Sequence, residues 1–175
     1  MLRTPKHTLA LALSAALIFI LCAGISLAED EIKAAGTMTM TEARQDTMIV
    51  GNTEGHNLSL LRSTGTNAAT GETKFMDGAQ AVNVSFSDLV KGKGPHSGYL
   101  ILVQNETSVF IKWKGTVTTV QRKEPPPLTS FAGTFNWTGG TGQYAKIKGK
   151  GTFKGHFTSP TAYTADWSGE YSLGE

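Results

Sequence analysis

The chain has 175 residues, with 16 Lys and Arg against 14 Asp and Glu and a single cysteine. Residues 1–28 hold that cysteine, Cys22, together with Arg3 and Lys6. The remaining 147 residues (175 − 28) therefore carry 14 basic side chains (16 − 2), 14 acidic ones and no cysteine. This excludes a disulfide framework, a cysteine nucleophile and a thiolate metal site from those residues, and net charge gives no reason to expect nucleic-acid binding. A segment of this length suits one domain.

The first predicted element, residues 1–28, has the pattern of a secretory signal peptide. Two basic residues precede an apolar run from about Leu9 to Ile25, and small residues at positions 26 and 28 precede a cleavage point after Ala28. An uncleaved membrane anchor is the alternative, because the run is borderline in length for spanning a bilayer. We expect cleavage and a periplasmic or secreted protein of one domain, residues 29–175.

Beyond residue 30 the sequence favours strands, because apolar and polar positions alternate and no helical period lasts beyond about two turns. About ten short strands are expected, at Gly36–Glu42, Met48–Val50, Asn57–Ser63, Ala79–Phe86, Gly98–Gln104, Ser108–Lys114, Thr116–Arg122, Ser130–Thr138, Lys146–Thr158 and Ala162–Tyr171. The expected turns are Gly65–Asn67, Lys91–Pro95, Asn105–Glu106, Pro125–Pro127 and Ser159–Pro160. So many short strands in one domain predict an all-β barrel or sandwich.

The clearest alternation spans Lys146–Phe157. One face carries aliphatic and aromatic residues interleaved with three glycines, and the other carries lysines, a threonine and His156. Residues 131–137 and 163–171 also interleave aromatic residues with glycine on one face. Glycine is unfavourable in a flat strand, but it suits a strand that coils sharply or packs against a neighbouring ring. The pattern is typical of a small closed barrel.

Eight aromatic residues are predicted to point into that barrel: Tyr99, Trp113, Phe135, Trp137, Phe153, Tyr163, Trp167 and Tyr171. They would either fill the interior or line a ligand cavity. Residues Tyr99–Val103 are apolar on both faces of the expected strand. This predicts that its outer side is covered by another element or by another subunit of a homo-oligomer.

The segment Trp137–Phe153, WTGGTGQYAKIKGKGTF, resembles the C-terminal signature of secreted bacterial proteins with the allene oxide cyclase-like barrel. Asp77–Ala79, Gly94–Tyr99 and the stretch from Phe157 to Tyr171 extend the resemblance over most of residues 36–173. The superfamily also contains plant allene oxide cyclases and dirigent proteins. The resemblance implies an antiparallel, calycin-like barrel of about eight strands, with a tight turn and a short helical twist before the penultimate strand. Catalytic residues of neither plant group can be placed on this sequence.

Seven residues are candidates for ligand binding: His56, Arg62, Asp77, His96, Tyr99, Trp113 and Trp167. The two histidines stand beside glycine near expected strand ends, where barrel mouths lie. The histidines of residues 29–175 lie on separate segments without ligand spacing, so we expect no metal. The loose G-x-G-x-x-A at residues 140–145 is interpreted as a turn, because no helix follows it. No cofactor is expected, and the catalytic residues are unknown.

Charge is distributed unevenly along the chain. Residues 29–90 carry 4 basic and 9 acidic side chains, whereas residues 91–175 carry 10 and 5. The lysines at 146, 148, 150 and 154 share one face of an expected strand. They would either make weak contact with an anionic envelope surface or keep the strand soluble and unpaired.

Three functional hypotheses follow. The leading one is an exported, non-enzymatic barrel that binds a small hydrophobic ligand in its lumen. The second is an isomerase or cyclase acting on a lipid-like substrate, which the resemblance to plant allene oxide cyclases implies. The third is a structural or interaction protein of the cell envelope. Shifted pKa values on side chains converging in a dry lumen would favour the enzyme.

Overall fold

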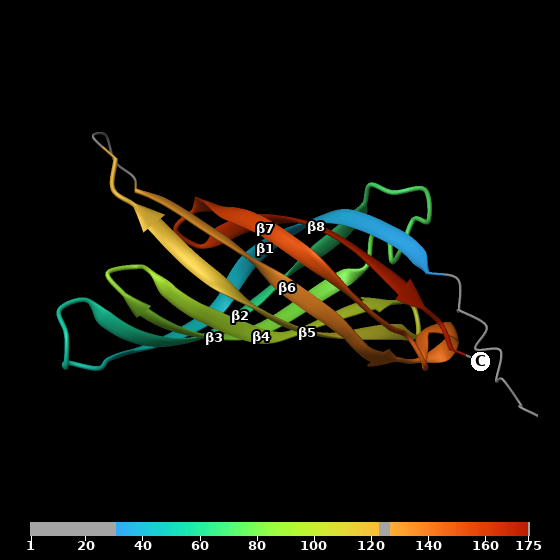
Figure 1. Cartoon of the computed structure of the whole chain (residues 1–175), viewed down its shortest axis with the longest axis horizontal. Coiled ribbons are helices and arrows are strands. Elements are labelled where there is room, and N and C mark those ends of the chain that lie inside the picture. Colours follow the sequence, from blue (N-terminus) through green and yellow to red (C-terminus); the bar gives the residue numbers. More distant parts are fainter. Residues whose placement is uncertain (1–30, 123–126, 175) are drawn as a thin grey trace, which may run out of the picture.

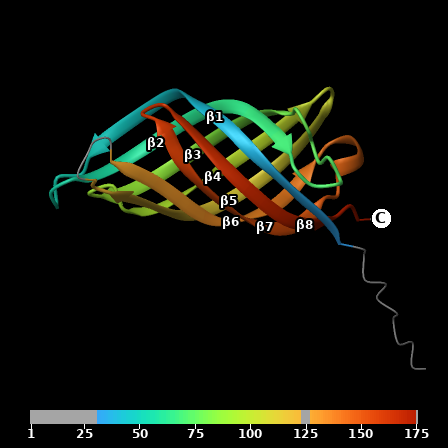
Figure 2. The ribbon, with the colours of Figure 1, turned by 90° about the horizontal axis from the view of Figure 1, so that it is seen from above.

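The structure, a computed structural model, describes residues 31–122 and 127–174. The expected signal peptide and Pro125–Pro126 of the expected proline turn lie outside these residues. Eight strands follow one another in the chain: β1 (Ile32–Ile49), β2 (His56–Ala69), β3 (Gln80–Val90), β4 (Gly94–Gln104), β5 (Thr107–Val120), β6 (Leu128–Gly140), β7 (Lys148–Ser159) and β8 (Ala162–Ser172). A 3-10 helix, η1 (Gly142–Tyr144), precedes β7. Figures 1 and 2 show the strands wound into one elongated, strongly tilted barrel.

Each strand pairs antiparallel with its neighbour in the chain, and β1 also pairs with β8, so the barrel is closed. This confirms the predicted all-β antiparallel barrel of about eight strands. The prediction of ten was too high, because two pairs of expected strands are single long strands, β1 and β5. β1 continues through a register shift between Glu42 and Arg44, and β5 continues through Gly115.

The predicted turn at Gly65–Asn67 is wrong, because these residues lie inside β2. A Cβ on Gly65 would stand 2.0 Å from the carbonyl oxygen of Thr39 on β1. Glycine therefore marks a close approach of two strands here. The same reason explains the glycines among aromatic residues: a Cβ on Gly151 would lie 2.2 Å from Cζ of Phe135. This confirms the expected close packing of rings against glycine.

The two ends of the barrel differ. The β1–β2, β3–β4 and β7–β8 connections, the end of β5 and the start of β6 lie at one end, which we call the hairpin end. The β2–β3 loop, η1 and both ends of the barrel domain lie at the other, as the right side of Figure 1 shows. The expected short helical twist before the penultimate strand is thus confirmed as η1.

An aromatic floor closes this second end. Phe75 of the β2–β3 loop is 2% exposed, and its ring centroid lies 5.0–5.9 Å from those of Trp137, Tyr144, Trp167 and Tyr171. Asn67 fixes the loop, because its side-chain amide donates to the carbonyls of Phe75 (3.1 Å) and Met76 (2.9 Å). Its Oδ1 accepts from Nε1 of Trp167 at 2.9 Å. All hydrogen-bonding groups of this buried side chain are thus used.

The expectation that Tyr99 points into the barrel is wrong, because Tyr99 lies on the outer wall. Leu100 and Leu102 point inward and are buried, whereas Tyr99 points outward and is 58% exposed. No element of the described chain covers the outer side of Tyr99–Val103, so coverage by a second subunit stays a prediction. The lysines at 148, 150 and 154 are exposed on β7, and their contact with an anionic surface also stays a prediction. No helix in the described residues is long and apolar enough to span a membrane.

Candidate functional site: a cavity inside the barrel

A cavity of about 350 Å³ lies inside the barrel, between the floor and the hairpin end. Phe75 forms its bottom, and a polar rim of Gln45, Ser59, Ser87, Thr119 and Thr129 surrounds it near the hairpins. Small-molecule sites in proteins are concave, largely apolar spaces of about 300–1,000 Å³. This cavity falls in that range.

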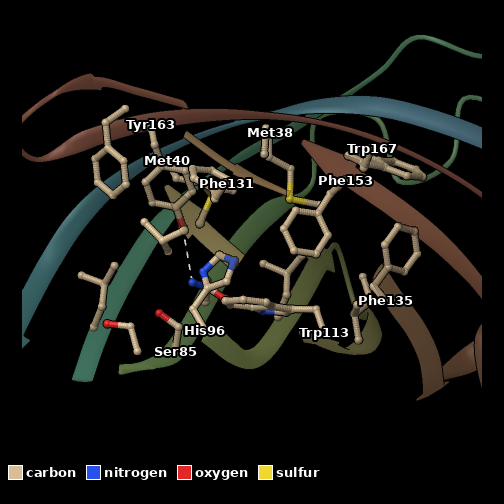
Figure 3. Close-up of a pocket in the computed structure, with 18 of the residues that line it drawn as sticks. Met38, Met40, Ser85, His96, Trp113, Phe131, Phe135, Phe153, Tyr163 and Trp167 are labelled. Carbon is tan, nitrogen blue, oxygen red and sulfur yellow. Dashed lines mark hydrogen bonds between the residues drawn. The ribbon is translucent and has the colours of Figure 1, made fainter. Parts of the chain in front are cut away.

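Aromatic and polar side chains line different walls of the cavity. Strands β6, β7 and β8 supply most of the rings, namely Phe131, Phe135, Trp137, Phe153, Phe157, Tyr163 and Trp167. Strands β2 and β3 supply serines and an asparagine, namely Ser59, Asn83, Ser85 and Ser87. Figure 3 shows side chains from opposite walls converging on one space, with Ser85, His96 and Trp113 facing Met38, Met40 and Tyr163. A molecule in this space would meet rings on one side and polar groups on the other.

A hydrogen-bonded cluster of four side chains crosses the polar wall. Oγ of Ser63 and the hydroxyl of Tyr163 lie 2.7 Å apart. The side-chain amide of Asn83 donates to Tyr163 (3.3 Å) and Ser63 (3.4 Å), and its Oδ1 accepts from Nε1 of Trp113 at 2.9 Å. Ser63 is fully buried, whereas Asn83, Trp113 and Tyr163 line the cavity. The cluster joins β2, β3, β5 and β8 and fixes the orientation of each polar group.

Three titratable side chains line the cavity, and burial shifts the pKa of each. Burial raises the pKa of Glu42, which lies half-buried near the rim. Burial also raises the pKa of Tyr163, aided by the nearby Glu42 charge and opposed by its hydrogen bonds to Ser63 and Asn83. Loss of hydration lowers the pKa of His96 to about 4. His96 is therefore neutral at pH 7.

His96 is held by rings. Its centroid lies 4.8 Å from that of Trp113, 5.8 Å from Phe131 and 6.1 Å from Phe153, each in an edge arrangement. Its Nε2 is buried and has no hydrogen-bond partner among the described residues. Gly115 on β5 makes room for this ring, because a Cβ there would stand 2.8 Å from Nε2.

Three of the seven sequence candidates, His96, Trp113 and Trp167, line the cavity. Each of the three stands on the inward-facing side of its strand, which is β4 for His96, β5 for Trp113 and β8 for Trp167. Tyr99 does not line it, because it is three residues from His96 on β4 and faces the opposite side of the wall.

The other three candidates also lie outside the cavity. His56 stands at the start of β2, where its Nε2 lies 2.7 Å from Oδ1 of Asp88. Arg62 is exposed on the outer face of β2, one residue from the inward Ser63. Asp77 belongs to the β2–β3 loop at the floor end, where its Oδ1 accepts from the backbone N–H of Ala69. His56 and Asp77 therefore each have a partner within the protein, at opposite ends of the barrel.

Sequence reasoning placed Tyr163 inside the barrel but missed the polar cavity residues Glu42 and Asn83 and the buried Ser63 beside them. On β3 the polar Asn83 and Ser85 face inward, while Val84 and Phe86 face outward and are 42% and 46% exposed. The usual assignment of apolar residues to the interior therefore fails on this strand. The strict alternation of polar and apolar residues on β3 was visible in the sequence. Which of the two faces points inward depends on the pairing of Asn83 with the buried Ser63 on β2.

The described residues hold no group of three or more His, Cys, Asp or Glu side chains that could bind a metal ion. No protein-family model matches the chain, and no curated protein matches it. Among solved structures the chain is similar to a pterocarpan synthase dirigent protein. The alignment covers 81% of this chain and 85% of that one, with 9% identity and a TM-score of 0.45.

Proposed function

We propose that this protein binds a small, predominantly apolar molecule inside the barrel. The observation that carries the proposal is the cavity of about 350 Å³ inside the barrel, which the aromatic side chains leave unfilled. Interiors of folded proteins are normally packed to the density of organic crystals. A space of this size costs stability unless an occupant contributes contacts, and a wall of rings offers such contacts to an apolar ligand.

The test is a neutral fluorescent probe, N-phenyl-1-naphthylamine, whose emission increases in apolar surroundings. We expect saturable binding to the wild-type protein. Ser85→Leu places a larger side chain in the cavity and should weaken probe binding at least about tenfold, which corresponds to about 1.4 kcal/mol. Ser97→Leu is the matched control, because Ser97 is exposed on the outer face of β4.

Two results would contradict the proposal. One is the absence of saturable binding to the folded wild-type protein. The other is equal binding by both serine variants, which would place the probe on the outer wall. Thermal unfolding of each variant verifies that it is folded before the comparison.

A second candidate function, an isomerase or cyclase acting on a lipid-like substrate, has one observation in its favour. Glu42, His96 and Tyr163 all line the cavity with shifted pKa values, a combination found at catalytic sites. Desolvation is the first cause of each shift, and no hydrogen bond joins the three side chains to one another in the described structure. A proton-transfer site requires its acid and base within hydrogen-bond reach of the reacting atoms. Binding is therefore the function that this geometry supports better.

A further inference from the structure

We infer that the ligand is not an anion and carries an oxygen atom that accepts a hydrogen bond from the Ser63–Tyr163 hydroxyl pair. This inference rests on the proposed binding function and names the chemical class of the ligand. It is carried by two independent features of the cavity. The first is a hydroxyl hydrogen that the protein leaves unused, and the second is the absence of cationic side chains from the lining.

The unused hydrogen follows from counting donors and acceptors. Ser63 and Tyr163 each supply one hydroxyl hydrogen, and their 2.7 Å contact uses only one of the two. Asn83 does not take the other, because its amide nitrogen is the donor in both contacts, and its Oδ1 contacts Trp113 rather than either hydroxyl. Within the described structure no other acceptor contacts the pair. One hydroxyl hydrogen is therefore left over.

Burial decides which hydroxyl keeps that hydrogen. Ser63 is 0% exposed and does not line the cavity, whereas Tyr163 does. An unsatisfied buried donor costs about 1–3 kcal/mol, so Ser63 donates to Tyr163 rather than keeping its own hydrogen unpaired. The Tyr163 O–H then faces the cavity as a free donor. A ketone, ether or alcohol oxygen on the ligand would accept the hydrogen bond from this hydroxyl.

Charge on the lining excludes anionic ligands. Of the residues that line the cavity, Glu42, His96 and Tyr163 are the titratable ones, and none is Lys or Arg. A carboxylate ligand would meet no cation, would be repelled by Glu42 and would lose its hydration among aromatic rings. Glu42 lies close to the hydroxyl pair, because it is the register partner of Ser63 on β1 and its charge raises the pKa of Tyr163. A neutral molecule incurs none of these costs.

The experiment compares matched naphthalene derivatives. The ketone 2-acetonaphthone accepts a hydrogen bond, and 2-isopropenylnaphthalene has the same shape without the oxygen. The measured quantity is the affinity for the ketone divided by the affinity for the hydrocarbon, determined for wild type and for Tyr163→Phe. Comparing this ratio between the two proteins cancels the different hydrophobicities of the two compounds. We expect the preference for the ketone to fall about three- to tenfold in Tyr163→Phe, the range for one neutral hydrogen bond. Tyr99→Phe, on the outer wall, should leave it unchanged.

A charged analogue completes the test. We expect 2-naphthoate to bind at least about tenfold more weakly than the ketone, because the cavity lining offers it no cationic partner. Tighter binding of the naphthoate would overturn the inference, as would a ketone preference unaltered by Tyr163→Phe. In both cases the hydrocarbon would still bind, so the proposed function would stand. Failure of all three compounds to bind would instead remove the proposed function.

A second measurement keeps the inference testable if Tyr163→Phe does not fold. The carbonyl stretch of ¹³C-labelled 2-acetonaphthone moves to lower frequency when its oxygen accepts a hydrogen bond. In the wild-type complex we expect the frequency to lie below that of the ketone in hexane. A frequency equal to that in hexane would show an unpaired carbonyl and would overturn the inference.

Discussion

Replacing Phe75 by alanine should lower the free energy of unfolding by about 3–5 kcal/mol, the range for removing a fully buried phenylalanine. Phe75 contacts four other aromatic rings, and it is the residue of the β2–β3 loop that closes the end of the barrel. Its removal would leave a void that the paired strands around it cannot contract to fill. Because Phe75 also forms the bottom of the cavity, that void would join it.

Urea unfolding measures this effect, and Phe86→Ala is the matched control. Phe86 lies on β3, but its ring faces outward and is 46% exposed. Its truncation should cost less than about 1 kcal/mol. Similar losses for the two variants would show that Phe75 does not close the floor as described.

The second large effect concerns acid. Burial lowers the pKa of His96 to about 4, against 6.5 for the free side chain. Between these values the unfolded chain holds a proton at this position and the folded protein does not, so folded stability falls as pH is lowered from 6.5 towards 4. The difference corresponds to a loss of up to about 3 kcal/mol, at about 1.4 kcal/mol for each pKa unit. Above pH 6.5 this contribution is constant.

His96→Leu isolates the effect, because leucine retains apolar contact with the rings and cannot be protonated. Carboxyl groups titrate in both proteins, so the measured quantity is the difference in unfolding free energy between them at pH 7, 5.5 and 4.5. We expect the leucine variant to gain on the wild type as pH falls. A parallel pH dependence would contradict a buried neutral histidine. Proton NMR of the wild type gives an independent check, because the His96 ring resonances should titrate near pH 4.

Much of the fold could be predicted from residue patterns, and the reasons are local. Alternation over Lys146–Phe157 identifies one buried face because side chains on a strand alternate with period two. Glycine was harder to interpret. Gly65 looks like a turn signal, yet it lies within a strand, where the approach of Thr39 requires the missing side chain. Such a requirement becomes visible only when the partner strand is known.

The cavity was only partly predictable. Trp113 and Trp167 were expected to point inward, Trp167 because it falls in phase with Tyr163 and Tyr171, and both do. Tyr99 was wrongly expected to point inward. Its strand is apolar on both faces over residues 99–103, so the sequence does not indicate which face lies inside the barrel. The polar cluster could not be found from the sequence, since Ser63 and Tyr163 are 100 residues apart and meet only when β1 pairs with both β2 and β8.

The most direct test of binding inside the barrel uses the tryptophan indoles, because all three tryptophans of the chain line the cavity. Trp113 donates to Asn83 and Trp167 to Asn67, whereas Nε1 of Trp137 is buried without a partner in the described structure. In a ¹H–¹⁵N NMR titration with N-phenyl-1-naphthylamine, the indole N–H resonances are observed separately from those of residues on the outer wall. We predict that indole resonances shift and saturate with the affinity measured by fluorescence, while the amide of the outward Tyr99 stays in place. Unchanged indole resonances at saturating probe would contradict a ligand site in the lumen.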